Sequence, residues 1–333
     1  MNRFVLAALI ACVPIGVAHA RSEDGTLNIV RLPNNGQPAI VVRGESFTVR
    51  AVGKPDVFVD RGAQLIELTA QWRSLPGGQQ EAKVLVPEGF EPGLYNLVGI
   101  LNEVEDIQHR ALLVLDTVPV KYNVAHIATP GIDAQQEASL TGAFADSNVL
   151  FAIVTGDLTA SGDVDEYRTL LDWLNTSSIA TLVVPGQRDS AKAQLTNYFD
   201  PAPRVIACGR DAFITVGETT PMVGEDLFQD AGIYESLRSE IKPARWSIGI
   251  SGYAPSSFSP RMQIVLFVDT PLHAIITGRV GEPTHETPVV NWESFHGATR
   301  ILTPAADQQV GIHWIHISPS GVVADKSPQA RQP

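Results

Sequence analysis

Short apolar runs separated by turn-forming residues fill the first third of the chain after residue 26. This pattern predicts strands over 38–42, 46–52, 63–72, 82–86, 94–100 and 110–115. Strands at intervals of about 8–12 residues, with turn signals between them, are typical of a β-sandwich. We expect strand 94–100 to fold back on strand 82–86 as a hairpin across the turn from Pro87 to Gly93.

Strand–helix alternation begins at residue 122. Buried strands are predicted over 123–128, 149–155 and 179–184, and a helix over 163–174. Apolar strands that alternate with helices favour a sheet covered on both faces. Ligands of such sheets bind at strand ends, and the predicted strands end at Gly156-Asp157 and Gly186-Gln187-Arg188-Asp189. The linker from Val118 to Tyr122 is so short that we expect a packed interface between the two parts.

The first twenty residues have the pattern of an export signal. Arg3 precedes an apolar run from Phe4 to Val17, and Ala18-His19-Ala20 is a small-x-small cleavage site. We expect cleavage after Ala20 and a periplasmic or secreted product, with lipid attachment at Cys12 as the alternative. The run is too short to span a membrane, and we predict no integral membrane segment.

Composition narrows the possible partners. Acidic residues outnumber basic ones by 36 to 24, and the net charge is −12. Nucleic acid is therefore disfavoured, because binding to it needs basic patches. An apolar fraction of 44% excludes wholesale disorder. After cleavage Cys208 is the single remaining cysteine, which excludes an intramolecular disulfide, and its apolar neighbours predict a buried thiol rather than a nucleophile.

Five motifs after residue 122 resemble those of the calcineurin-like metallophosphoesterase family, in the family's order: Val124–Ile132, Gly156–Gly162, Val184–Asp189, Ile248–Pro255 and Ala274–Gly281. The resemblance implies an α/β fold, a four-layer α/β sandwich of metallo-dependent phosphatase type, over residues 122–324. The segment Val86–Leu97 resembles the return strand of bacterial immunoglobulin-like modules, which implies a small all-β sandwich domain over 21–118. Residues 1–20 are then the signal peptide and 325–333 a polar tail.

By this resemblance Asp157 is the one retained metal ligand. Arg188 occupies the position of the histidine that protonates the leaving group, so no catalytic residue is expected. The family's other ligand positions hold Thr129, Gly131, Gln187, Tyr253, Arg279 and Gly281. Glycine offers no side-chain donor, and arginine keeps its positive charge and repels a dication. The resemblance therefore implies no bound metal.

Other donors near these motifs are predicted to be structural. His126 lies on an apolar strand and His273 within the predicted strand that leads to Gly278. His313 and His316 are three apart on a predicted strand, so they face opposite sides. Asp133 follows the first motif, and a shifted alignment would place His285, beside Glu286, in a histidine position. Neither restores the ligand set.

These substitutions predict a non-catalytic binding or scaffold protein, a pseudo-phosphoesterase whose partner is a protein or a small anionic ligand. One alternative is an active phosphoesterase with an unusual or mononuclear site that uses Mn, Fe or Zn. Another is a purely structural envelope module. The binding site is predicted from Asp157, Arg188, Arg279, Asp189, Thr129, Gln187 and Tyr253.

An unpaired Asp157 carboxylate in the former metal site is costly if buried. We therefore expect an ion pair with an arginine. Arg279 is favoured over Arg188, since Arg188 has Asp189 as an alternative partner.

Overall fold

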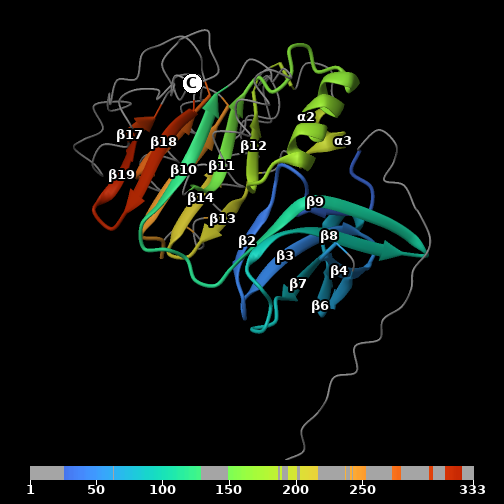
Figure 1. Cartoon of the computed structure of the whole chain (residues 1–333). Coiled ribbons are helices and arrows are strands. Elements are labelled where there is room, and N and C mark those ends of the chain that lie inside the picture. The colour runs from blue at the N-terminus through green and yellow to red at the C-terminus, as the bar shows by residue number, and fades with distance from the viewer. Residues whose placement is uncertain are drawn as a thin grey trace, which may run out of the picture.

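The computed structural model describes residues 26–62, 64–128, 149–186, 188–189, 194–200, 203–216, 237, 241, 243–252, 272–278, 300–302 and 312–324. In this part of the chain strands predominate and helices are few (Figure 1). No helix within the described ranges is long and apolar enough to cross a membrane. The predicted signal peptide and the polar tail lie outside these residues.

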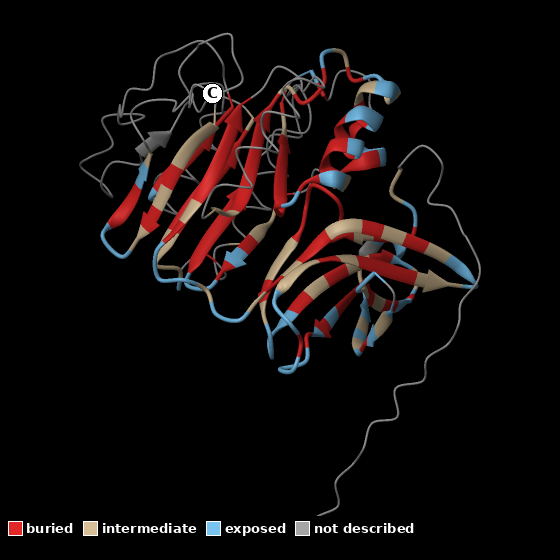
Figure 2. Ribbon diagram, viewed as in Figure 1, coloured by how far each residue is buried: buried red, intermediate tan, exposed pale blue. Residues whose placement is uncertain are grey.

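Two facing sheets form a β-sandwich in the first part of the chain. One sheet has the order β1-β3-β7-β6, and the other β2-β9-β8-β4-β5. Buried and partly exposed side chains alternate along most of these strands (Figure 2), and the inward ones form one hydrophobic core that includes Val49, Val84, Leu97 and Leu112. The strand bounds are β1 Val30–Leu32, β2 Ala39–Val42, β3 Ser46–Val52, β4 Asp56–Asp60, β5 Leu65–Leu68, β6 Ala70–Ser74, β7 Gln79–Leu85, β8 Gly93–Leu101 and β9 Val104–Leu115, with the short 3-10 helix η1 Pro76–Gly78 before β7.

The predicted hairpin between strands 82–86 and 94–100 is wrong. Strand β8 pairs with β9 and β4, whereas β7 pairs with β3 and β6 in the other sheet. The segment after β7 crosses between the sheets because Val86 is held by the turn before β3: Gly44 N donates to Val86 O at 2.8 Å and Val86 N to Glu45 O at 2.9 Å. The hydroxyl of Tyr95 then donates to the carbonyl of Glu91 at 2.8 Å and fixes the start of β8.

The predicted strand 63–72 is two strands in different sheets. Strand β5 pairs with β4, and β6 pairs with β7 after the chain changes sheets at Thr69. No glycine or proline marks this crossing, which is why the sequence pattern reads through it. Strands β1 and β4 were not predicted.

Two further five-stranded sheets pack face to face in the second part, with the orders β12-β11-β10-β18-β19 and β13-β14-β15-β16-β17. A continuous core lies between them, built from inward residues of both sheets such as Phe151, Ile153, Phe213 and Ile250. The bounds are β10 Tyr122–Ala128, β11 Val149–Gly156, β12 Thr181–Pro185, β13 Val205–Cys208, β14 Asp211–Thr215, β15 Trp246–Ser251, β16 Ala274–Thr277, β17 Arg300–Leu302, β18 Ile312–Ser318 and β19 Gly321–Ala324.

Helix α2 (Val164–Thr176) covers the outer face of the first of these sheets and confirms the predicted helix. It begins where Glu166 Oε2 accepts the backbone N–H of Asp163 at 3.1 Å. Its apolar face packs on β11 and β12 together with the short helix α3 (Leu195–Tyr198), whose Tyr198 stacks on Tyr167 with ring centroids 4.6 Å apart. Two inner sheets and one helical layer are thus present in the described residues. The four-layer form remains a prediction.

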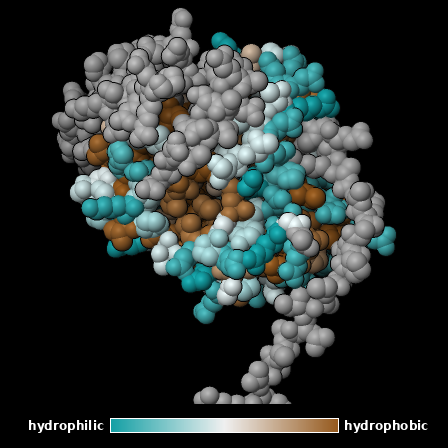
Figure 3. Space-filling model, viewed as in Figure 1, coloured by the Kyte–Doolittle hydropathy of each residue, from teal (hydrophilic) through white to brown (hydrophobic). Residues whose placement is uncertain are grey.

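The sandwich is joined to the two-sheet unit along strand β12. Val183 N donates to Gly36 O at 2.6 Å, so the segment before β2 extends the edge of that sheet. Asn35 Nδ2 donates to Asn175 Oδ1 at 2.6 Å, and Gln37 Nε2 donates to Asp200 O at 2.6 Å. Ile40, Leu94 and Leu113 of the sandwich pack against the core between the two sheets of the second part. Hydrophobic side chains also gather near the middle of the face drawn in Figure 3. The interface is therefore packed, as the short linker predicted.

Candidate functional site

Four glycines of the sequence motifs meet where β11, β12, β15 and β16 end. A Cβ added at Gly186 would lie 2.6 Å from the carbonyl carbon of Gly156, and one at Gly278 would lie 2.5 Å from Gly156 N. A Cβ at Gly252 would overlap the carbonyl oxygen of Pro185. Only glycine allows backbones to approach so closely, so these positions bring the loops of two sheets together at one edge.

Asp157 and Arg188 form an ion pair at this edge. The backbone N–H of Arg188 donates to Asp157 Oδ1 at 2.9 Å, and Arg188 Nε lies 3.3 Å from Asp157 Oδ2. The side chains are 28% exposed for Asp157 and 57% for Arg188. Both oxygens of the carboxylate are thus engaged by one residue. The predicted ion pair of Asp157 is present, but with Arg188; Arg279, the favoured partner, lies outside the described residues.

Asp189 is fully buried and ties the two neighbouring loops together. Its Oδ2 accepts the backbone N–H groups of Leu158 at 3.0 Å and Gly186 at 2.8 Å. Its Oδ1 accepts the N–H of Thr159 at 2.8 Å and the hydroxyl of Thr159 at 2.7 Å. Burial raises the pKa of Asp189 to about 6, and the hydrogen bonds oppose that rise. The alternative pairing of Arg188 with Asp189 is wrong, because backbone amides and a threonine hydroxyl occupy this carboxylate.

A second layer of contacts holds this arrangement from α2. The hydroxyl of Tyr167 donates to the carbonyl of Asp189 at 2.8 Å. Thr159 Oγ1 also accepts the N–H of Gly162 at 3.1 Å. Neither Thr159 nor the hydroxyl of Tyr167 was predicted from the sequence to belong to the site. The one available signal was the position of Thr159 two residues after Asp157, in a loop of small and polar residues.

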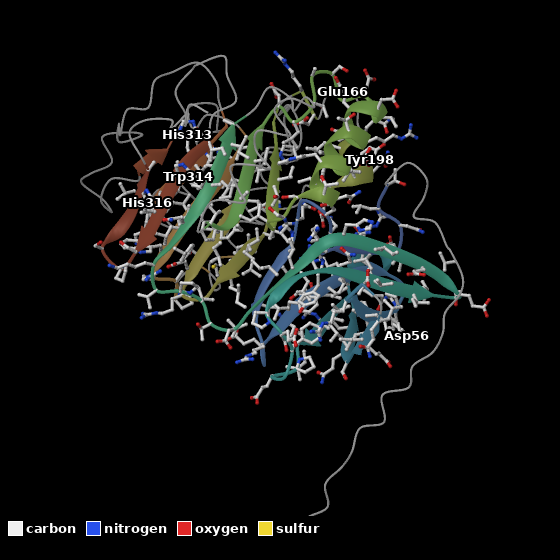
Figure 4. All side chains as sticks on the ribbon, viewed as in Figure 1. Asp56, Glu166, Tyr198, His313, Trp314 and His316 are labelled. Atoms are coloured by element: carbon white, nitrogen blue, oxygen red, sulfur yellow. The ribbon has the colours of Figure 1, made fainter. Side chains whose placement is uncertain are left out.

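The four histidines predicted to be structural differ in their burial. His126 is buried and its Nε2 lies 2.7 Å from Thr155 Oγ1. Burial, with His313 nearby, lowers the pKa of His126 to about 3. His273 Nδ1 accepts the N–H of Ser247 at 3.1 Å. His316 faces Asn123, on the opposite side of β18 from His313, and Figure 4 labels both. The predicted burial of His126 and the opposite orientations of His313 and His316 are confirmed, whereas the predicted place of His273 within a strand is wrong, because His273 is exposed and precedes β16.

Cys208 lies in a buried cluster at the other end of the strands. Its thiol is fully buried, as predicted, and burial raises the pKa of that thiol to about 12. Next to it, the hydroxyl of Tyr122 donates to Asp211 Oδ2 at 2.9 Å, and Arg245 Nε donates to Asp211 Oδ1 at 2.8 Å. Arg245 also donates to the carbonyl of Val120 at 3.0 Å, so this cluster holds the linker to the second sheet.

The remaining predicted site residues lie outside the described residues. They are Thr129, Gly131, Asp133, Gln187, Tyr253, Arg279, Gly281, His285 and Glu286.

The described residues do not fit a two-metal centre. A dication at Asp157 would have to displace a guanidinium that keeps its positive charge. No cluster of three or more His, Cys, Asp or Glu side chains suited to a metal occurs within the described ranges.

No protein-family model matches the chain, and no curated protein is similar enough to count as a relative. Among solved structures, the chain is similar to a purple acid phosphatase isolated from yellow lupin (Lupinus luteus) seeds, at 11% identity over 82% of this chain and 67% of that chain, with a TM-score of 0.48. It is also similar to a titin–obscurin-like immunoglobulin complex, at 19% identity over 27% of this chain and 91% of that chain, with a TM-score of 0.18. Similarities at these TM-scores carry no conclusion about this chain, whose fold and site rest on its own geometry.

Proposed function

We propose that this chain is an exported, non-catalytic binding protein of the metallophosphoesterase-like type, in which the ion pair of Asp157 and Arg188 replaces the metal centre. The observation that carries the proposal is that Arg188 engages both oxygens of the Asp157 carboxylate. The glycine contacts between four motif loops support it, because they bring the loops of the motif frame together at this edge.

The chemistry of the pair disfavours phosphoester hydrolysis. A two-metal phosphoesterase needs two cations to activate water and to stabilise the phosphoryl oxygens. A carboxylate already neutralised by a guanidinium is a poor ligand for either cation. Arg188 cannot act as the general acid in place of histidine, because guanidinium does not lose its proton in proteins.

The same pair supports binding of an anionic group. The Nε of Arg188 faces Asp157, and the Arg188 side chain is 57% exposed. A guanidinium carries further N–H donors in a planar fork. These donors suit a carboxylate or phosphate group of a partner. The net charge of −12 favours a small or locally anionic partner over a polyanion, which the whole protein would repel.

Activity and metal content of the mature protein test this proposal. We expect no turnover of bis-p-nitrophenyl phosphate with added Mn, Fe or Zn beyond that of Asp157→Ala, and no stoichiometric metal by elemental analysis. Asp165→Ala is the matched control, since Asp165 is an exposed carboxylate on α2. Chelator-sensitive turnover that Asp157→Ala abolishes and Asp165→Ala leaves intact would overturn the proposal in favour of an active phosphoesterase.

A further inference from the structure

The guanidinium of Arg204 is a buried cation beside the sandwich. Its backbone is fixed before β13: Arg204 N donates to Thr215 Oγ1 at 3.0 Å, and Thr215 N donates to Arg204 O at 3.0 Å. Both terminal nitrogens of its guanidinium, Nη1 and Nη2, are buried, and neither makes a hydrogen bond with a residue that the structure describes. Burial lowers the pKa of Arg204 to about 10, which still leaves the group charged at neutral pH. A buried charge that lacks a partner is costly, so this position calls for an anion.

The charges around Arg204 do not balance. The carboxylate of Asp200 raises the pKa of Arg204 and the guanidinium of Arg50, on β3 of the sandwich, lowers it. Arg50 Nη1 lies 3.8 Å from Asp200 Oδ2, and Arg50 Nε donates to Glu81 Oε2 at 3.2 Å. Arg73 pairs with the same Glu81. Among the described residues this cluster holds three arginines and two carboxylates, so its net charge is one positive. Its members are Arg50, Arg73, Arg204, Glu81 and Asp200.

Asp200 is anchored through its backbone to the sandwich. Gln37 Nε2 donates to Asp200 O at 2.6 Å, and Asp200 N donates to Gln37 Oε1 at 2.8 Å. The carboxylate of Asp200 lies within ion-pair distance of Arg50, with Oδ2 3.8 Å from Nη1. Arg204 thus lies where the sandwich and the two-sheet unit meet.

We propose that Arg204 and Arg50 bind a small oxyanion, a carboxylate or a phosphate group, in the seam between the sandwich and β13. Two guanidinium groups from different parts of the chain offer such an anion several N–H donors at once. An anion bound here would contact both parts and hold them together. This site is separate from the pair of Asp157 and Arg188 and does not depend on the function proposed for that pair.

Thermal unfolding of the full mature chain with added anion tests this inference. We expect inorganic phosphate or acetate to raise Tm at constant ionic strength, relative to chloride, because a ligand that binds only the folded state stabilises it. A rise with phosphate alone identifies a phosphate site, and a rise with acetate as well identifies a site for carboxylates. Arg204→Met should abolish the rise, and Arg204→Lys should weaken the apparent affinity about tenfold or more.

The controls separate the two anion sites and guard against misfolding. Arg204→Met removes a buried unpaired charge and keeps an unbranched side chain, so we expect its Tm without added anion to equal or exceed that of the wild type. Arg188→Met should leave the anion effect at the seam unchanged. No rise in the wild type, or an equal rise in wild type and Arg204→Met, would overturn the inference. A rise lost in Arg188→Met but kept in Arg204→Met would also overturn it, while supporting the function proposed for Arg188.

Discussion

The carboxylate of Asp157 is held twice by Arg188, through the backbone N–H at 2.9 Å and through Nε at 3.3 Å. The backbone contact fixes the loop after β12, and the side-chain contact supplies the countercharge. Because one residue makes both contacts, the loop conformation and the neutralisation of Asp157 are coupled. An uncharged side chain at this position would keep the first contact and lose the second.

Arg188→Ala should therefore change binding more than stability. The pair is partly exposed, and exposed ion pairs contribute about 0–1 kcal/mol. We expect a loss of stability within that range by urea unfolding, together with loss of any binding of inorganic phosphate by titration calorimetry, because the N–H donors of the guanidinium are removed. Arg168→Ala, which removes an exposed partner of Asp165, is the control. A loss of several kcal/mol would show instead that the pair is a structural plug.

Asp189 should make stability depend on pH between about 4 and 6. Its pKa is raised to about 6 in the folded protein, against about 3.9 for an unperturbed aspartate. The folded state thus holds the proton more tightly, and its stability falls as pH rises from about 4 to about 6. Asp189→Asn should lack this slope, so denaturant unfolding of both proteins at several pH values measures it. Parallel curves for the two proteins would contradict the prediction.

His126 should act in the opposite direction. Its pKa is lowered to about 3 in the folded protein, against about 6.5 in the unfolded chain. The unfolded state therefore takes up the proton first, and stability is lost as pH falls from about 6.5 towards 3, at up to about 1.4 kcal/mol per pH unit. His126→Gln should flatten this limb of the stability curve. His316→Gln, in the next strand of the same sheet, is the control for losing a strand histidine.

Backbone crowding at the site makes a sharper prediction for glycine. A Cβ at Gly278 would lie 2.5 Å from Gly156 N, which leaves the backbone no room to relax. We expect Gly278→Ala to cost at least about 3 kcal/mol, the upper range for overpacking, or to prevent folding. Gly89→Ala is the matched control, because nothing lies within 4 Å of its added Cβ. Similar stabilities of the two variants, by thermal unfolding, would mean that the loops do not meet as described.

The sequence predicted the elements far better than it predicted their partners. Most predicted strands and α2 stand where the hydrophobic pattern placed them, because local periodicity sets element type. The predicted hairpin between strands 82–86 and 94–100 was wrong because the backbone of Val86 forms hydrogen bonds with Gly44 and Glu45. The hydrophobic periodicity does not predict this contact. The resemblance of the Gly156–Gly162 motif likewise identified Asp157, but it did not decide which arginine neutralises that carboxylate.

Arg204 shows the same limit at the seam. In the sequence it is one arginine between a proline and an apolar run. Its surroundings form only in the fold, where Arg50, distant in sequence, and the nearby Asp200 both lie close enough to affect its charge.

The sandwich and the two-sheet unit are expected to depend on each other for folding. Val183 on the edge strand β12 depends on Gly36 for its backbone hydrogen bond, and Gly36 packs against Phe199 so closely that an added Cβ would lie 2.8 Å away. Ile40, Leu94 and Leu113 cover the core of the two-sheet unit. A fragment that begins near residue 120 would expose that core and leave the edge of β12 unpaired. We therefore expect limited proteolysis to yield no stable fragment that starts there, and a chain expressed from residue 119 to aggregate or unfold at a lower temperature than the full mature protein. A soluble fragment with an unchanged Tm would show that the two parts fold independently and that the seam is only a contact between finished domains.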